Sequence, residues 1–331
     1  MPEQDNLDWG LVHAFVLDGQ GGARGISREA LDGLQLQSTE SLWLHWDRSH
    51  PLTQRWLREQ SGISEFACDL LLEENTRPRQ LQLPGDALLL FLRGVNLNPG
   101  AEPEDMVSAR IFADPRRVIS LRLRPLRATE EIIAQLEKGY GPKNSAELIL
   151  QLAHYLADRV DAVIEGLSEQ LDEQEERLDS DERYMPNHGL MLHVRLRAAN
   201  LRRFLAPQRE IYSQLARNEF AWFAKDDTDY WNELSNRLIR YLEELELVRE
   251  RVGLVLEAEH RRMSEKMNRT MYRLGIITGF FMPMSFITGL LGINLGGMPG
   301  AEYGHGFLLA CVLLGAVACF QWWLFRRLRW L

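Results

Sequence analysis

The chain has 331 residues, of which 26% are charged and 45% are hydrophobic, enough for two ordinary domains. The charge is unevenly divided: residues 1–266 carry 33 basic and 46 acidic side chains, whereas residues 267–331 carry five basic and one acidic. A net charge of −13 over the first part argues against nucleic acid as a partner, because that requires clustered Lys and Arg. The opening MPEQDNLDWG lacks the apolar core of a signal peptide.

Residues 1–141 alternate between predicted strands and helices. Short strands are expected in LVHAFVLDGQGG and SLWLHWD, and longer ones in ALLLFLRGVNL and on either side of Asp114-Pro115. HPLTQRWLREQSG is predicted to be helical, and so is TEEIIAQLEKG, with Thr129 as its N-cap and Gly139 as its stop. We therefore expect a mixed α+β domain.

From Ser145 onward the pattern is purely helical. One long helix starts there and a second covers about 189–223, so residues 142–226 are expected to form a helical hairpin. A third helix starts near Asp227–Asp229, whose carboxylates suit a helix N-terminus. Its apolar residues recur at alternating intervals of four and three residues, which predicts a coiled-coil seam. The seam residues are Leu234, Leu238, Tyr241, Leu245, Val248, Val252 and Val255.

Two uncharged runs follow, Leu274–Leu291 with 18 residues and Phe307–Phe325 with 19. Each is long enough to cross a hydrocarbon core of about 30 Å. The first run is expected to continue the third helix, giving one stalk and span over residues 227–291. Arg and Lys precede the first run and follow the second in the tail at 326–331, while the loop at 292–306 has neither. The positive-inside rule then places both termini in the cytoplasm.

One face of the first run carries small, polar or thioether side chains at intervals of three and four. Such residues allow close helix packing, or they line a water-filled pore in a symmetric bundle; both interpretations stay open at this point. Pro283 frees a backbone carbonyl that a neighbour or pore water must satisfy. We call this face the polar stripe: Asn268, Met271, Gly275, Thr278, Met282, Ser285 and Gly289. The bulky face, expected to meet lipid or the second run, holds Ile276, Ile277, Phe280, Phe281, Ile287 and Leu291.

Gly292-Ile293-Asn294 ends the first run. Repeated around an axis, Asn294 would place a ring of amide oxygens at the pore mouth, where they can hydrogen-bond the water shell of a cation and hold the ion transiently. The same tripeptide is also consistent with a glycine C-cap followed by an asparagine turn.

Further metal-type side chains lie outside the stripe. Glu302 and His305 in the loop either gather cations outside or belong to an ordinary polar loop. His260, beside Glu257 and Glu259, is either a metal ligand or part of a solvated helix face. The first long helix has an acidic face that either raises the local cation concentration or is simply solvated. Its members are Asp158, Asp161, Glu165, Glu169, Asp172, Glu173, Glu175 and Glu176.

The segment MNRTMYRLGIITGFFMPMSFITGLLGINLGGMPG resembles the membrane signature of the CorA family of divalent metal transporters. In that family a Met-Asn pair opens the pore helix, Pro interrupts it, and Gly-Met-Asn ends it before a short loop and a second span. The resemblance implies a homopentamer with a funnel-shaped cytoplasmic domain and no resident cofactor. By position it assigns the pore lining to Asn268, Met271, Leu274, Thr278, Met282 and Ser285, with Leu274 where the stripe has Gly275.

Ile293 stands where the family has Met, and Gly296-Gly297 follow. In this the chain resembles the ZntB branch of bacterial zinc transporters, which implies Zn²⁺ transport across the inner membrane, with lipid, protons and divalent cations as partners. Proton-coupled uptake describes that branch, and export is the alternative. Other interpretations are a magnesium, cobalt or nickel channel, or a membrane-tethered coiled-coil scaffold or sensor. No P-loop, nucleophile elbow or HExxH motif indicates an enzyme.

Overall fold

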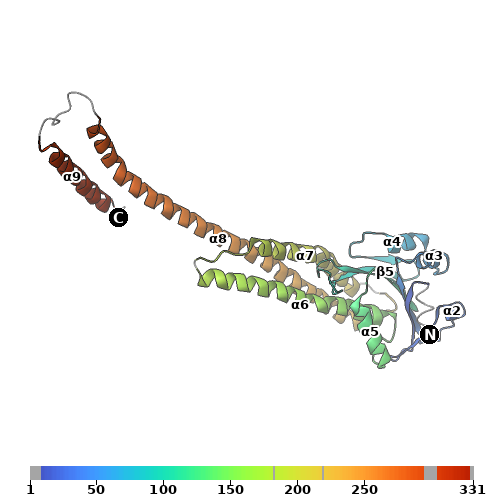
Figure 1. Cartoon of the computed structure of the whole chain (residues 1–331). Helices are drawn as coiled ribbons and strands as arrows, with labels where there is room; N and C mark the ends of the chain where they lie inside the picture. Colours follow the sequence, from blue (N-terminus) through green and yellow to red (C-terminus); the bar gives the residue numbers. More distant parts are fainter. Residues whose placement is uncertain (1–8, 182, 218–219, 294–303, 329–331) are drawn as a thin grey trace. The chain divides into compact units, whose positions relative to one another are not determined.

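In the computed structural model, residues 9–181, 183–217, 220–293 and 304–328 are described. The chain forms two compact units, which we call the sheet unit (Met1–Val255) and the span unit (Leu256–Leu331) (Figure 1). One helix, α8 (Asp227–Leu291), contributes to both.

A seven-stranded sheet lies at the centre of the sheet unit, in the order β2-β1-β3-β7-β6-β5-β4. β3 and β7 pair in parallel, and all other neighbouring strands pair antiparallel. The expected mixed α+β domain is therefore confirmed. The strands are β1 (Leu11–Leu17), β2 (Ala23–Gly25), β3 (Ser41–Asp47), β4 (Arg79–Leu83), β5 (Ala87–Gly94), β6 (Val107–Asp114) and β7 (Arg117–Arg122).

Helices cover both faces of this sheet. On one face, α3 (Pro51–Glu59) and α4 (Glu65–Leu72) complete a core in which Trp46 stacks on Trp56 with ring centroids 4.4 Å apart. The other face carries α5, α6 and α7. Because helices cover both faces of the sheet at β5, this strand is a continuous apolar run and does not alternate between apolar and polar residues. The remaining helices of the unit are α2 (Arg28–Leu31), α5 (Arg127–Glu137), α6 (Ser145–Ser180) and α7 (His188–Arg217).

The second face is fixed by two close contacts with β5. A Cβ atom at Gly94 would lie 2.4 Å from Cδ2 of Leu156 in α6, so any larger residue would have to displace this buried side chain. On α7, the fully buried Gln208 accepts a hydrogen bond from the backbone N–H of Arg93 at 2.7 Å and donates to the Tyr212 hydroxyl at 3.0 Å. Its amide therefore satisfies polar groups of both strand and helix.

The predicted seam of α8 is buried within this unit, and each of its seven residues is at most 5% exposed. Side chains of α6 and α7 lie alongside it: Arg251 donates to Asp172 of α6 at 2.5 Å, and Ser235 donates to the carbonyl of Arg209 in α7 at 3.5 Å. The sequence-based expectation of a buried seam is confirmed, and the covering partners are helices of the same chain.

Two helix boundaries differ from the sequence-based expectation. Thr129 is not the N-cap of α5; the helix starts at Arg127 after Leu126, and the buried Thr129 hydroxyl donates to the Leu126 carbonyl at 2.6 Å inside the first turn. The stop at Gly139 is confirmed by its φ of +80°. α7 ends at Arg217 rather than near residue 223. Beyond it, Asp86 accepts a hydrogen bond from the backbone N–H of Ala221 and so holds the chain in a turn.

Candidate ion-conducting site

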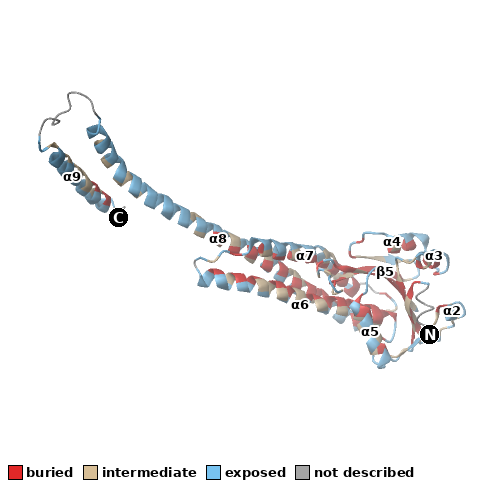
Figure 2. Cartoon of the chain, in the orientation of Figure 1, coloured by how far each residue is buried: buried red, intermediate tan, exposed pale blue. Residues whose placement is uncertain are grey.

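Among its described residues, the span unit contains two helices that are long and apolar enough to cross a bilayer: the C-terminal part of α8, and α9 (Gly306–Arg327). The most apolar windows of these two helices have mean hydropathies of 1.8 and 2.1, and 0% and 6% of those windows is buried. A core helix of a soluble protein would be mostly buried, so this exposure favours membrane spans. Figure 2 shows this part of α8 and most of α9 in the colour of exposed residues.

α9 packs against part of the bulky face of α8. Phe325 is 6% exposed, and its ring lies so close to Gly279 that a Cβ atom there would be 3.2 Å from Cζ of Phe325. The residues of α8 that are only partly exposed over this stretch repeat at three and four positions, as expected for one covered face. They are Ile276, Gly279, Phe280, Met284 and Ile287.

Pro283 is accommodated at this contact. A proline inside a helix removes the N–H that would bond the carbonyl four residues earlier, here that of Gly279. Gln321 of α9 is 8% exposed, and its Nε2 donates to the Gly279 carbonyl at 3.3 Å. In hydrocarbon an unsatisfied carbonyl costs several kcal/mol, so the side-chain amide stabilises the interrupted helix. Sequence reasoning expected a neighbour or water here but did not identify Gln321.

The polar stripe lies on another side of α8. At 3.6 residues per turn, it is roughly opposite the face that α9 covers. All seven of its residues are exposed, with Met271 at 63% and Met282 at 65%. Leu274, at 57%, is exposed as well, so its choice over the neighbouring Gly275 stays a prediction.

The hydroxyl groups of this part of α8 fall into two classes. Those of Thr270 and Thr288, outside the stripe, donate to backbone carbonyls of their own helix at 2.9 and 3.0 Å. Among the described residues, the stripe hydroxyls of Thr278 and Ser285 have no hydrogen-bond partner. They are therefore available to bind water or the hydration shell of an ion.

The mouth motif is described only in part. Gly292 closes the helix, its N–H donating to the carbonyls of Thr288 at 2.9 Å and Gly289 at 3.2 Å. Ile293 is 44% exposed, and the exposed His305 precedes the first turn of α9. Asn294 and Glu302 lie outside the described residues, so the amide ring and the external cation-gathering pair stay predictions.

The acidic face of α6 is partly engaged in ion pairs. Arg251 of α8 binds Glu175 and Asp172, both at 2.5 Å, and these carboxylates raise the pKa of Arg251. Asp158 pairs with Arg237 at 3.2 Å, and Glu173 pairs with an arginine of its own helix. Half of the predicted face therefore binds arginine side chains, two of them on α8.

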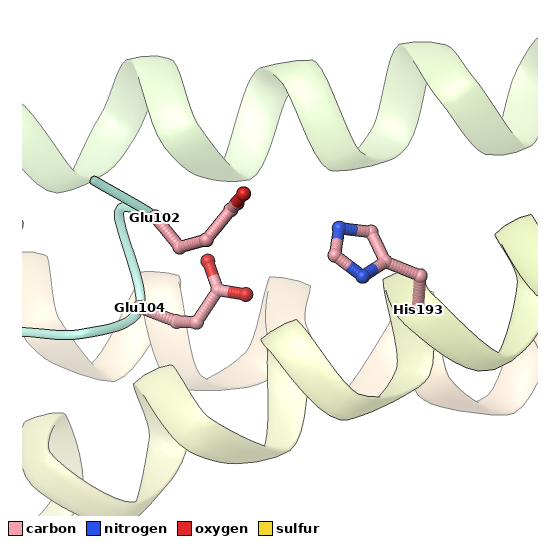
Figure 3. A group of neighbouring side chains, drawn as sticks. All are labelled: Glu102, Glu104 and His193. Carbon is pink, nitrogen blue, oxygen red and sulfur yellow. The ribbon is translucent and has the colours of Figure 1, made fainter. Parts of the chain in front are cut away.

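Of the charged groups considered near the start of the first span, Glu257 and His260 are exposed and Glu259 is buried. Their side chains do not converge on one point. Within the part of the chain that the structure describes, a different group of metal-type side chains does: Glu102, Glu104 and His193 offer ligand atoms within 4.8 Å of one another (Figure 3). Sequence reasoning missed this group because its members come from a loop and a helix far apart in the chain.

Comparisons with known proteins identify the family. The sequence profile described as "CorA-like Mg2+ transporter protein" matches residues 38–327. The divalent cation transporter CmaX of Pseudomonas aeruginosa is 63% identical over 322 residues, covering 97% of both chains. The zinc transport protein ZntB of Pectobacterium carotovorum is 34% identical over 326 residues, covering 97% of this chain and 96% of its own. The solved structure of full-length CmaX superimposes with a TM-score of 0.87 and covers 97% of this chain and 98% of that one.

Proposed function

The chain belongs to the CorA family of metal-ion transporters, and on that premise we propose that it assembles as a homopentamer and carries divalent cations, Zn²⁺ foremost, through a pore lined by the polar stripe of α8. Family membership confirms the prediction that the protein is not an enzyme. The relative named as a divalent cation transporter supports the ion class, and the relatives named as zinc transport proteins support zinc.

One observation carries the proposal: the polar stripe is left uncovered, while α9 takes part of the bulky face. A lone span in lipid would turn its polar atoms inward or bond them to its own backbone, as Thr270 and Thr288 do. Thr278 and Ser285 instead present unbonded hydroxyls on the side away from α9. Two spans enclose no pore, so several copies must meet around an axis with the stripe facing the centre.

The stripe suits an ion that keeps its water. It offers hydroxyl, amide and thioether groups and contains no His, Cys or carboxylate, which are the side chains that bind dehydrated Zn²⁺ tightly. Weak contacts of this kind let a cation enter and leave. Asn294 at the mouth would hold a hydrated ion briefly, and Glu302 with His305 would gather ions at the outer surface.

The proposed orientation is that of a bacterial inner-membrane protein with both termini in the cytoplasm. The basic residues on the inner flanks of both spans support it, because such residues stay on the cytoplasmic side. The indole rings of Trp322 and Trp323 lie under Arg326 and Arg327, at 5.4 and 5.3 Å, as expected of an interfacial belt. We propose inward Zn²⁺ flux driven by protons as the physiological direction.

Flux into proteoliposomes tests the pore. Vesicles loaded with a zinc-sensitive dye receive external Zn²⁺ with and without an inward proton gradient. The wild type should show flux that the gradient increases. Thr278→Leu replaces a stripe hydroxyl by a bulky apolar group and should lower the flux at least about tenfold, a barrier increase of about 1.4 kcal/mol.

The matched control is Thr288→Val, which removes a hydroxyl that bonds only its own helix and should leave the flux within about twofold. Equal losses in both variants would show that the stripe does not line the path. Parallel runs with Co²⁺, Ni²⁺ and Mg²⁺ measure selectivity, and the absence of flux for every ion would favour a scaffold or sensor.

A further inference from the structure

The loop between β5 and β6 presents two glutamates from a backbone that its own hydrogen bonds hold in place. The N–H of Asn96, a residue 1% exposed, donates to the carbonyl of Pro103 at 3.1 Å. The N–H of Asp105 donates to the carbonyl of Glu102 at 3.0 Å, so Glu102 and Glu104 lie within one turn. Their positions are set by the main chain, and binding an ion there would cost little reordering.

Glu104 is oriented by a charged neighbour. Its side chain is 9% exposed, and its Oε2 accepts a hydrogen bond from Nε of Arg197 at 2.9 Å. The second carboxylate oxygen, Oε1, has no hydrogen-bond partner among the described residues. One oxygen of this buried group is thus fixed and the other is available as a ligand.

His193 completes the group from α7. It precedes Arg197 by four residues, so both side chains project from the same helix face toward the loop. Figure 3 shows the His193 ring facing the carboxylates of Glu102 and Glu104 across an open space. Among the described residues, neither the imidazole nor the Glu102 carboxylate makes a hydrogen bond.

We infer that Glu102, Glu104 and His193 form a binding site for a zinc-class divalent cation, with water as the fourth ligand. Two carboxylates and one imidazole are the ligand types that Zn²⁺ accepts in tetrahedral geometry, and the imidazole favours Zn²⁺, Co²⁺ and Ni²⁺ over Mg²⁺. The cation also relieves the repulsion between two carboxylates whose oxygens lie within 4.8 Å of the same imidazole nitrogen and of each other. Arg197 keeps its bond to Oε2 and acts as the group that orients the ligand.

The site would join the sheet to the helical hairpin. Glu102 and Glu104 belong to the loop that connects two central strands, and His193 belongs to α7. A bound ion therefore crosslinks two parts of the sheet unit and stabilises the folded form relative to the unfolded chain. This inference does not rest on the transport proposal, because the site lies wholly in the sheet unit and its test is binding.

Metal titration of the full-length protein tests the site. Metal-stripped protein in detergent is titrated with Zn²⁺ by calorimetry, and separately with Co²⁺, whose visible absorption reports nitrogen and oxygen ligands in a tetrahedral site. His193→Ala and Glu102→Gln change exposed side chains, so both should fold, with thermal unfolding in the absence of metal as the check. Each should weaken one site per chain at least about tenfold and remove its Co²⁺ absorption.

Two control variants match these changes: His188→Ala on the same helix and Asp105→Asn in the same loop should leave the binding isotherm unchanged. Zn²⁺ should raise the unfolding temperature of the wild type and both controls more than that of His193→Ala. Millimolar Mg²⁺ should not displace Co²⁺. If His193→Ala and Glu102→Gln bind Zn²⁺ as the wild type does, the three side chains form only an ion-pair cluster with Arg197 and the inference is wrong.

Discussion

The sheet unit and the span unit use one helix in opposite ways. In the sheet unit, α8 carries large apolar side chains at intervals of three and four residues. Other helices of the same chain cover them, and each is at most 5% exposed. In the span unit, α8 carries small, polar and thioether side chains at the same intervals. These side chains are exposed; Met282, for example, is 65% exposed. The same spacing therefore marks a face that is packed within the chain in the sheet unit, and a face that we propose to line an aqueous space in the span unit.

Buried polar groups divide in the same way. In the sheet unit, buried polar side chains bond to neighbours of the same unit: His45 Nδ1 lies 2.7 Å from the Ser120 hydroxyl, and Gln208 accepts a hydrogen bond from a strand N–H. In the span unit the buried Gln321 amide serves the carbonyl that Pro283 leaves free. The hydroxyls of Thr278 and Ser285 have no hydrogen-bond partner among the described residues. Three predictions test this contrast.

The largest effect is expected in the buried seam. Leu245→Ala removes a side chain that is 0% exposed, which should cost about 2–5 kcal/mol in the free energy of unfolding. The unfolding temperature of the sheet unit should fall by about 5–15 °C. Tryptophan fluorescence during heating measures it, because Trp43, Trp46 and Trp231 are buried there.

The control for that substitution is Leu247→Ala, two residues along the same helix and 54% exposed, which should change stability by less than about 0.5 kcal/mol. Similar losses in both variants would mean that the Leu247 side chain is also packed against other residues. The seam would then not be the main buried face of α8.

A smaller effect is expected from acidification. Burial, followed by the charges of Arg122 and His13, lowers the pKa of His45 well below its ordinary value, so the folded chain keeps this imidazole neutral. The unfolded chain takes up a proton below about pH 6.5. Stability from this group is therefore present above that pH and is lost below it, by up to about 1.4 kcal/mol per pH unit.

Unfolding temperatures measured from pH 7.5 to 5.5 check this prediction, with His45→Gln as the comparison. The variant starts less stable, but it should lose less stability on acidification than the wild type does. Equal slopes would assign the acid sensitivity to other groups.

The smallest effect is expected at the helix contact in the span unit. Gln321→Leu removes the donor to the Gly279 carbonyl, and hydrogen bonds between membrane helices contribute about 0.6–1.7 kcal/mol. Pro283→Ala supplies an N–H for the same carbonyl from within α8. Heat inactivation of flux in proteoliposomes should therefore be faster in Gln321→Leu, and the loss should be smaller when Pro283→Ala is also present. Additive effects would show that Gln321 does not serve this carbonyl.

Sequence reasoning predicted what depends on local pattern and missed what depends on contacts between distant segments. The strands β5, β6 and β7 and the start of α6 follow from apolar runs and from Asn144, whose side chain caps the first turn. The elements α2, β2, β4 and α4 were not predicted because they are four, three, five and eight residues long, too short for a clear period.

The candidate sites show the same limit. The polar stripe can be recognised from the sequence because its residues share one helix, whereas in the proposed pore the facing side chains would belong to other copies. Thr129 has the side chain of an N-cap, but its hydroxyl bonds a carbonyl inside the first turn, and only the backbone conformation shows this. The group of Glu102, Glu104 and His193 depends on α7 lying against the β5–β6 loop, which no spacing in the sequence encodes.

The bond from Gln321 to Gly279 has a mechanical consequence. Proline makes α8 easiest to bend at this point, yet bending α8 away from α9 would expose the Gly279 carbonyl to hydrocarbon. The cheaper motion carries α9 along, with Phe325 still seated over Gly279. In the proposed pentameric pore, widening would then tilt α8 and α9 of each subunit together.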